Sequence, residues 1–487
     1  MKRVAIAIAL AAVALALAAQ PIQIPEVVVA GQSTLRDTLH TQQRHDLQAF
    51  WKVAGEQRFA YRYQPPFATS PVAADTTAHD GLIAVDAGTP QLVEVRLAYA
   101  DRDRPLLNFW TEAGMRAPED DWETTALRLG WLGHTGALGM RAGLCWAEHV
   151  TPLAGATITQ VGQTGGLQVN PAVLPTLVTA VNLRYGLRMF REETRAGKRE
   201  FNEADLTLST DLAQGARTAH IEAAFLKSSY SAQASVLSTA IPWLDEGGLW
   251  VAGDRDHAYA SLVFRKRLQV PGTYPRTFAL NLFNNPGMGR ASRASQLTEL
   301  PTQRIDGNKL QVKRPLDLHV ALEYNTFLSA SLEYRLAWLQ DCPVYARGLD
   351  SLYVQLPVDA WLHEATLSTS YSHSYFRFDN AFTWRATDPE QGDRLPWLAE
   401  MEDNLVLRAQ LERWSAGLAI RWLAGRKDDL DLTMEDVVLV DLEGHYSLYH
   451  NVQLRAAILN LLDEPYRPYA LLPAPGTQFR VGFDYHF

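Results

Sequence analysis

Hydrophobic and polar residues alternate along most of the chain after about residue 80, in runs that turn residues separate. The clearest run lies at 376–385, where aromatic residues alternate with mostly charged ones. One face would carry Phe376, Phe378, Phe382 and Trp384, and the other Arg377, Asp379, Thr383 and Arg385. A period of two residues is that of a β-strand, because successive side chains point to opposite faces. No sustained period of 3.6 residues interrupts the pattern. The sequence therefore predicts an all-β fold.

The length of these runs indicates where the strands lie. They extend to roughly 11 residues, which exceeds the 5 to 6 residues of typical strands and matches the 9 to 11 tilted residues that cross a bilayer. A sheet in lipid must close, since each unpaired edge amide costs several kcal/mol there. We therefore predict an antiparallel transmembrane β-barrel of outer-membrane type over 80–487. It should have about 20 strands, or about 22 if 48–63 adds a hairpin.

Connections in such barrels are short on one side and long on the other. Long gaps are predicted at 286–314, 341–360, 387–402, 427–434 and before 475. Short turns are predicted near Asn325, His373, Trp414 and His450, and further upstream at 133–136 and 211–215. An even number of strands places both ends of the barrel on the same side.

The N-terminus has the pattern of a secretory signal. Lys2 and Arg3 precede an apolar run from Val4 to Leu17, and small residues follow it. A membrane-spanning helix would need about 20 apolar residues, so we expect a cleaved signal over 1–19. Elsewhere no run of 18 apolar residues occurs, although 47% of the chain is hydrophobic. Helical membrane spans are therefore not expected.

Charge and cysteine content exclude some classes of protein. The net charge of −9 and the pI near 5.8 argue against nucleic-acid binding, which requires clustered lysine and arginine. The two cysteines are Cys145, in an apolar strand pattern, and Cys342, in an expected loop before a proline. They show no disulfide framework, and the sequence leaves open whether they pair. No metal-ligand spacing or cofactor motif is found.

The last residues alternate between large apolar residues and polar or small ones. The apolar set consists of Phe479, Val481, Phe483, Tyr485 and Phe487. A closing barrel strand needs such a lipid-facing side. We expect Phe479, Phe483, Tyr485 and Phe487 to act as the signal that the barrel-assembly machinery of the outer membrane recognises.

The preceding residues complete a longer motif. Asn460-Leu461-Leu462-Asp463-Glu464-Pro465-Tyr466, then Pro475-Gly476 and the final strand, resemble the closing hairpin of TonB-dependent receptors. The likeness covers about 30 residues, with Thr477 where the receptors often have arginine. The resemblance implies the barrel of such a receptor, in the outer membrane of a Gram-negative bacterium.

A second segment is similar to the TonB box of these receptors. It consists of Pro25, Glu26, Val27, Val28, Val29 and Ala30. These residues belong to an expected periplasmic N-terminal segment over 20–79, which also has a short helix pattern at 35–51 and a loop pattern at 64–78. A β-prone segment with unpaired amides can add to the sheet edge of a TonB-like partner; a disordered spacer and a first strand are the alternatives. The plug domain of the receptors is missing or vestigial.

These observations predict uptake or passage of an unidentified small solute across the outer membrane. Charged residues on the wet faces are expected to line the lumen and tune what passes: Glu333, Arg335, Arg377, Asp379, Arg385 and Arg408. The alternatives are a structural or assembly barrel without transport, or a passive porin. A barrel enzyme ranks third, because the histidines beside possible partners, at 220, 363 and 373, form no specific catalytic pattern. We therefore expect no enzymatic activity and no cofactor.

Overall fold

The computed structural model describes residues 79–486 with gaps. Every described residue belongs to one compact unit, Gln42–Phe487. The residues outside the description are 1–78, 90–91, 102–107, 117–122, 136–137, 154–155, 172–177, 195–196, 215–216, 227–228, 240, 242, 255–257, 272–275, 285–286, 289–312, 327, 348–352, 391, 393, 397, 412, 429, 450, 466–475 and 487. The TonB-box-like segment and Phe487 therefore lie outside the described residues.

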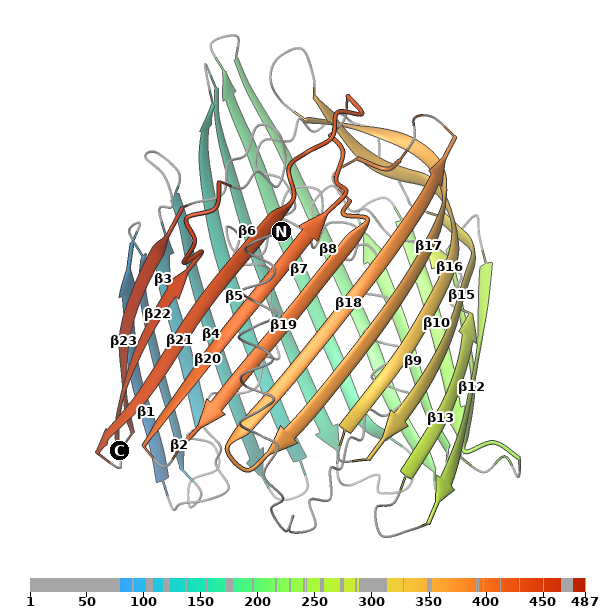
Figure 1. Cartoon of the computed structure of the whole chain (residues 1–487), viewed down its shortest axis with the longest axis horizontal. Helices are drawn as coiled ribbons and strands as arrows, with labels where there is room; N and C mark the ends of the chain where they lie inside the picture. The colour runs from blue at the N-terminus through green and yellow to red at the C-terminus, as the bar shows by residue number, and fades with distance from the viewer. Residues whose placement is uncertain are drawn as a thin grey trace. The chain divides into compact units, whose positions relative to one another are not determined.

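All regular elements of the described residues are β-strands (Figure 1). The first half contains β1 (His79–Gly88), β2 (Leu92–Asp101), β3 (Asn108–Arg116), β4 (Glu123–Thr135), β5 (Leu138–Leu153), β6 (Ala156–Pro171), β7 (Val178–Thr194), β8 (Gly197–Gln214), β9 (Arg217–Leu226), β10 (Ser229–Ser238) and β11 (Glu246–Asp254). The second half contains β12 (Ala258–Val270), β13 (Arg276–Asn284), β14 (Gly287–Met288), β15 (Lys313–Asn325), β16 (Leu328–Arg347), β17 (Tyr353–His373), β18 (Phe376–Pro389), β19 (Met401–Gln410), β20 (Trp414–Ala424), β21 (Val437–Tyr449), β22 (Val452–Leu459) and β23 (Gln478–His486).

The strands form one sheet that closes on itself. Each strand pairs antiparallel with its neighbours in sequence, and β1 pairs with β23, from Leu82 opposite His486 to Gly88 opposite Arg480. The two-residue β14 and the longer β13 both pair with β15, along successive parts of that strand, and thus share one position in the ring. The 23 described strands therefore form a ring of 22 positions. The predicted antiparallel barrel is confirmed. Its ring is complete from His79 onward and needs no hairpin at 48–63.

Glycine is required where the ring closes. A Cβ atom added to Gly88 would lie 2.5 Å from the carbonyl oxygen of Phe479. Beside it, the Thr89 amide donates a 2.8 Å hydrogen bond to that oxygen, and the Phe479 amide donates to the Thr89 hydroxyl at 3.1 Å. The ladder thus continues one residue past the end of β1, through contacts with β23 that a larger residue at position 88 would disrupt.

The two faces of the sheet differ in exposure, as the sequence pattern predicts. On β15, Leu318, Val320 and Leu322 are 39%, 39% and 52% exposed, whereas Asp317 and His319, which alternate with them, are 0% and 3% exposed. In a closed ring, inward side chains converge and shield one another while outward side chains diverge. The polar residues therefore face the interior, and the apolar residues form the outer wall. The described residues contain no helix that is long and apolar enough to span a membrane.

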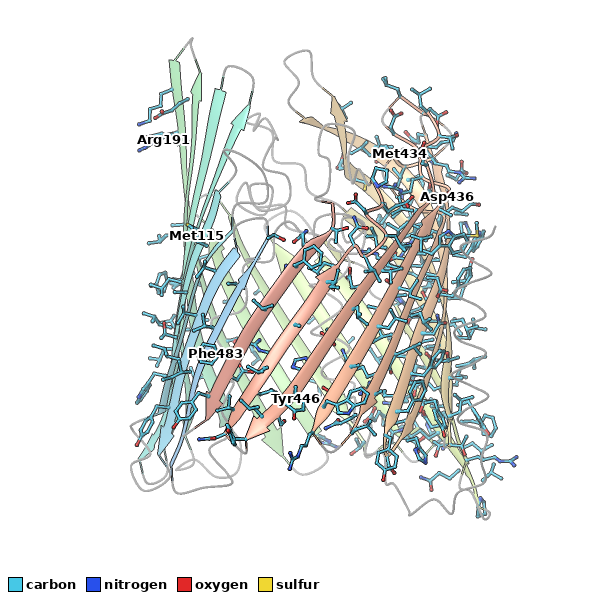
Figure 2. The ribbon with its side chains drawn as sticks, turned by 60° about the vertical axis from the view of Figure 1, so that its left-hand side comes forward. Met115, Arg191, Met434, Asp436, Tyr446 and Phe483 are labelled. Atoms are coloured by element: carbon cyan, nitrogen blue, oxygen red, sulfur yellow. The ribbon has the colours of Figure 1, made fainter. Side chains whose placement is uncertain are left out.

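The connections alternate in length only in the second half of the barrel. There the end of the barrel nearest His79 and His486 has tight turns, such as 374–375, while the far end has loops at 390–400 and 425–436. In the first half the far end instead carries long hairpins, because β5 to β8 run for 16 to 18 residues and two-residue gaps join β5 to β6 and β7 to β8. Figure 2 shows Arg191 on such a hairpin, at the opposite end from Tyr446. The turn predicted at 211–215 is displaced, since β8 continues to Gln214.

The predicted long gap at 341–360 is wrong. Most of it is an extended hairpin in which β16 and β17 stay paired as far as Arg347 and Tyr353. The register shifts between Leu339 and Cys342, where Asp341 has a φ of 52°, and the Asp359 carboxylate accepts a 2.8 Å hydrogen bond from the Asp341 amide. Cys342 is thus a buried strand residue with a free thiol, and does not lie in a loop.

The closing-hairpin motif forms a hydrogen-bonded turn at the end of β22. Asn460 and Asp463 both have a φ of 50°, a region in which asparagine and aspartate are more tolerated than other side chains. The Asn460 side chain donates to the Glu464 carbonyl at 3.0 Å and accepts from the Glu464 amide at 2.9 Å. Across the loop, the Thr477 hydroxyl donates to the Asn460 carbonyl at 2.9 Å, and the Thr477 amide donates to Asp463 at 2.9 Å. Thr477 therefore ties the last strand to this turn.

Candidate functional site

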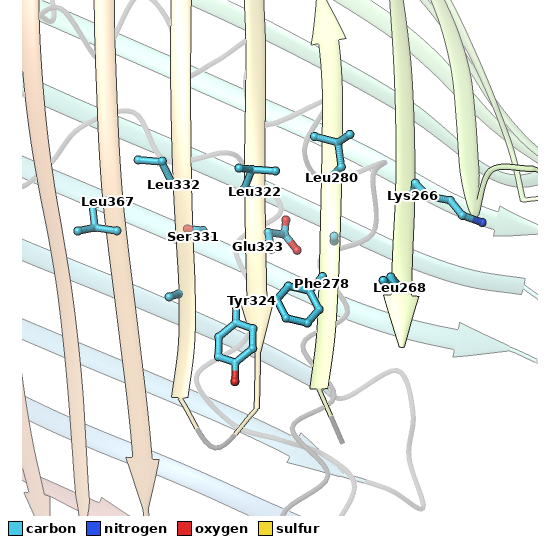
Figure 3. A pocket seen from close by; sticks show the side chains of 12 residues that line it. Lys266, Leu268, Phe278, Leu280, Leu322, Glu323, Tyr324, Ser331, Leu332 and Leu367 are labelled. Carbon is cyan, nitrogen blue, oxygen red and sulfur yellow. The ribbon is translucent and has the colours of Figure 1, made fainter. Parts of the chain in front are cut away.

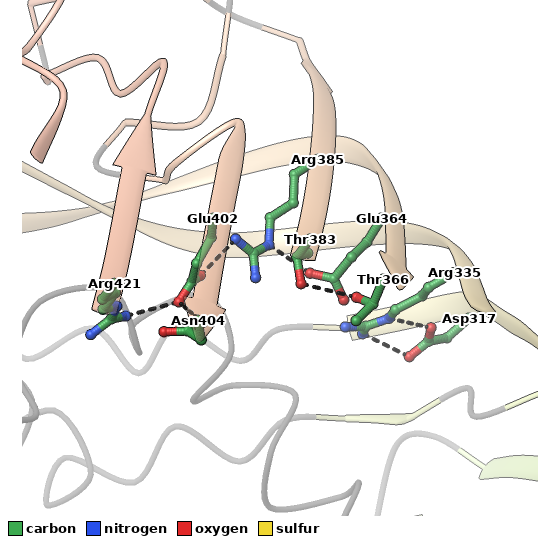
Figure 4. Close-up of polar contacts among 9 residues, drawn as sticks. All are labelled: Asp317, Arg335, Glu364, Thr366, Thr383, Arg385, Glu402, Asn404 and Arg421. Carbon is green, nitrogen blue, oxygen red and sulfur yellow. Dashed lines mark hydrogen bonds and ion pairs between the residues drawn. The ribbon is translucent and has the colours of Figure 1, made fainter. Parts of the chain in front are cut away.

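A row of charged side chains crosses the inner wall from β15 to β20 (Figure 4). We call it the inner-wall ladder. It consists of Asp317, His319, Glu333, Arg335, Glu364, Arg385, Glu402 and Arg421. β15 and β16 each contribute two residues spaced by two, and β17 to β20 contribute one each, all on the inward faces of their strands. The register of five strand pairs then decides which charges meet.

The first part of the ladder lies on β15 and β16. Arg335 binds Asp317 in a bidentate manner, with nitrogen–oxygen distances of 2.8 and 3.0 Å. His319 lies between two carboxylates, 3.0 Å from Asp317 and 2.9 Å from Glu333. Asp317 and Arg335 are almost fully buried, so their charges are stable there only because they are paired and hydrogen-bonded.

The second part lies on β17 to β20, where cations and carboxylates alternate. Arg385 of β18 binds Glu364 of β17 at 2.6 Å and Glu402 of β19 at 3.0 Å. Glu402 also accepts hydrogen bonds from Arg421 and Asn404, both at 3.0 Å. Arg385 thus connects two carboxylates, of which Glu402 has further partners.

A smaller cluster continues the polar wall on β11 to β15. Arg265 lies 3.0 Å from Glu323 and 3.7 Å from Glu246. The side-chain amide of Asn281 donates to the other oxygen of Glu323 at 2.6 Å. This cluster is also largely buried, and it shows that charge pairing on the inner wall is not confined to the ladder.

A loop from the far end packs directly beside the ladder. Leu395, in the loop between β18 and β19, is 3% exposed and belongs to one apolar cluster with Ala337 and Leu362. These two residues lie two positions from Arg335 and Glu364 on the same inward faces. Arg394 fastens the loop by binding Glu400 at 2.6 Å and the Gly425 carbonyl at 3.3 Å. The loop therefore covers the inner wall on the far-end side of the ladder.

The structure separates the six charged residues that the sequence places in the lumen. Glu333, Arg335 and Arg385 belong to the ladder. Arg377 and Asp379 form their own pair nearer the tight-turn end, at 2.7 Å, and Arg377 is 55% exposed. Arg408 lies directly opposite Arg377 in the register of β18 and β19. All six lie on inward faces by alternation, but only three share one network.

Sequence reasoning did not select five residues of the ladder: Asp317, His319, Glu364, Glu402 and Arg421. The period of two assigns Asp317 and His319 to the polar face, so a signal for their orientation is present. Their partners follow from the register between strands, which the pattern does not carry. His363 was one of the histidines that the sequence places beside a possible catalytic partner, the adjacent Glu364. The two do not pair, because adjacent strand residues point to opposite faces, and His363 instead lies 2.7 Å from the Tyr334 hydroxyl.

The ladder is chemically a balanced polar wall. Four carboxylates face three guanidinium groups and one imidazole, so neither sign of charge dominates. Among the described residues, no group of histidine, cysteine or carboxylate side chains has the arrangement of a metal site. Mutual pairing satisfies the charges of the ladder and fixes the position of each group, because most of these side chains are buried.

The final strand presents its aromatic residues to the outside. Phe479, Phe483 and Tyr485 are 54%, 42% and 37% exposed, and Figure 2 shows Phe483 on the barrel wall. They form part of the outer apolar surface next to β1 and β22. Recognition of these residues by an assembly machinery remains a prediction.

Comparisons with known proteins identify the fold. No family model matches the chain, and no curated protein matches its sequence. Among solved structures, the copper transporter OprC is 15% identical with a TM-score of 0.63, covering 84% of this chain and 80% of that chain. The FrpB iron transporter from Neisseria meningitidis is 9% identical with a TM-score of 0.60, covering 85% and 82%.

A variant of the ferric enterobactin receptor PfeA from Pseudomonas aeruginosa is also similar. It is 11% identical with a TM-score of 0.58, covering 85% of this chain and 81% of that chain. Identities this low show the fold alone. The resemblance to the barrel of TonB-dependent receptors is thus confirmed at the level of the fold, that of a transmembrane antiparallel β-barrel.

Proposed function

We propose that this protein lies in the outer membrane of a Gram-negative bacterium and takes part in the passage of a small polar solute. The observation that carries the proposal is the combination of a sealed ring with an apolar outer wall and a charged inner wall. An inner wall of paired charges is suited to a solute that exchanges hydrogen bonds with it. The similar structures include a copper transporter, an iron transporter and a ferric enterobactin receptor, which supports a transport role by analogy of fold.

The mode of passage that we propose is energised uptake. The segment Pro25 to Ala30 would add as a strand to a TonB-like partner in the periplasm, after cleavage of the signal over 1–19. Phe479, Phe483, Tyr485 and Phe487 would serve the barrel-assembly machinery beforehand. In this proposal the protein is a transporter and has no enzymatic role.

A deletion tests the coupling. Cells that depend on this protein for a solute should lose uptake when residues 25–30 are deleted, and keep it when the same length is deleted from the loop pattern at 64–78. Equal uptake by both variants would remove the proposed coupling. Surface levels of the barrel, measured by protease protection, serve as the control for export and assembly.

Conductance tests passage and the ladder together. The reversal potential of the purified protein is measured in planar bilayers under a potassium chloride gradient. In Arg385→Gln it should lie closer to the potassium equilibrium potential than in the wild type, because the inner wall has lost one positive charge. Arg394→Gln, which alters the loop beside the ladder, is the matched control for a change in loop position. A protein that conducts no ions in any of these forms contradicts a steady open pore; if the deletion of residues 25–30 also leaves uptake unchanged, a structural or assembly barrel is favoured.

A further inference from the structure

The outer wall carries an apolar groove near the tight-turn end of the barrel (Figure 3). It crosses β12 to β17 and has a volume of about 440 Å³. Its lining includes Leu268, Phe278, Leu280, Leu322, Tyr324 and Leu332. These residues point away from the inner wall, since they alternate with buried residues such as Ala279 and Ala321.

The groove has a local cause in side-chain size. Tyr324 lies directly opposite Ala330 in the register of β15 and β16, so a large ring stands next to a methyl group. On the other side, the rings of Phe278 and Tyr324 have centroids 5.1 Å apart at 47°. The two rings and Ala330 lie in one cross-strand row, and the leucines at 280, 322, 332 and 367 lie in the next row, so the small Ala330 leaves the surface depressed beside Tyr324.

A lysine stands at the edge of this groove on the same outward face. Lys266 pairs with Leu280 in the register of β12 and β13, and its side chain is 54% exposed. A lysine on a lipid-facing wall is unfavourable at the centre of a bilayer and costs little near the interface. β12 ends four residues later at Val270, so that the flexible side chain reaches the headgroup region.

The ammonium group of Lys266 retains hydrogen-bonding capacity. Its ion pair with Asp245 spans 4.0 Å, which is longer than a hydrogen bond, and an ammonium group has three donors. The other Asp245 oxygen accepts a hydrogen bond from the Arg267 amide. Asp245 therefore stays close to Lys266 although the Lys266 ammonium group donates no hydrogen bond to it.

We propose that the groove binds one anionic phospholipid of the adjacent leaflet, with an acyl chain along the leucines and the phosphate at Lys266. The leaflet is the one on the side of His79 and His486. The apolar lining and the single cation at its edge match the two parts of such a lipid. The inference goes beyond the proposed function, because it requires only that the outer wall faces lipid.

Native mass spectrometry of the full detergent-extracted chain tests the proposal. The probes are phosphatidylglycerol and phosphatidylcholine with identical acyl chains. The wild type should bind the first about fivefold more tightly, the factor that corresponds to about 1 kcal/mol for one basic residue at a membrane surface. Lys266→Gln should abolish this preference, and Lys198→Gln, at an exposed lysine on β8, should leave it unchanged.

Two further variants keep the test decisive. Ala330→Phe should fill the groove and weaken the binding of both lipids to the same extent. Asp245→Asn should increase the preference for phosphatidylglycerol, because it removes a negative charge that competes for Lys266. Equal affinities for the two lipids in the wild type, or an unchanged preference in Lys266→Gln, would overturn the proposal and assign the bound lipid to the general annulus. Ion conductance of the same samples reports separately on the proposed function.

Discussion

Replacing Arg385 with methionine should destabilise the barrel strongly. The guanidinium group binds Glu364 at 2.6 Å and Glu402 at 3.0 Å, and the two carboxylate side chains are 18% and 9% exposed. Removing one partner of a buried ion pair costs about 3 to 5 kcal/mol, because the other charge stays desolvated. Glu402 keeps Arg421 and Asn404, whereas Glu364 loses its 2.6 Å contact. We therefore expect a loss at the lower end, about 3 kcal/mol.

Urea unfolding of the barrel in lipid vesicles, followed by tryptophan fluorescence, measures this loss. Arg377→Met is the matched control, since Arg377 is 55% exposed and pairs with Asp379 on its own strand, where about 1 kcal/mol or less is expected. Glu364→Gln added to Arg385→Met should recover much of the stability by removing the stranded charge. If Arg385→Met and Arg377→Met lose the same free energy, the ladder is not a buried network and the reasoning fails.

Two other substitutions probe the closing turn and the outer wall. Asn460→Ala should cost about 2 to 3 kcal/mol of unfolding free energy, from two hydrogen bonds of about 1 kcal/mol each and up to about 1 kcal/mol because alanine tolerates a positive φ less well than asparagine does. Asn460→Gly should avoid only the backbone part of this cost, and equal losses in the two variants would contradict the role of the backbone. Leu262→Arg places a charge on the exposed middle of β12 and should cost about 2 to 4 kcal/mol in vesicles. An unchanged unfolding midpoint for this variant would show that the position does not face lipid.

The orientation of side chains was predictable from the sequence alone. A period of two residues assigns Leu318, Val320 and Leu322 to one face and Asp317 and His319 to the other, whatever the neighbouring strands are. The strand lengths and the need to satisfy every backbone amide in lipid then favour a closed barrel. The same alternation assigns Arg335 and Arg385 to the polar face of their strands without any knowledge of their partners.

Strand ends were harder to predict where proline and polar residues occur. The segment around Cys342 has the composition of a loop, yet β16 and β17 remain paired there, with Pro343 opposite Pro357. A bulge at Asp341 absorbs the irregularity. Local composition reports turn propensity, whereas a hairpin that continues beyond the apolar belt is held by cross-strand pairing between residues far apart in sequence.

The sequence by itself determined the all-β class, the alternating faces, the closing motif and the charge character of the interior. Only the tertiary structure decided which charges meet, that Leu395 folds back onto the inner wall and that Ala330 leaves a groove beside Tyr324. The physical reason is that a strand's own pattern fixes the direction of its side chains through backbone geometry. The register between strands, and the packing of a loop against them, arise from contacts over long sequence separations that no single segment encodes.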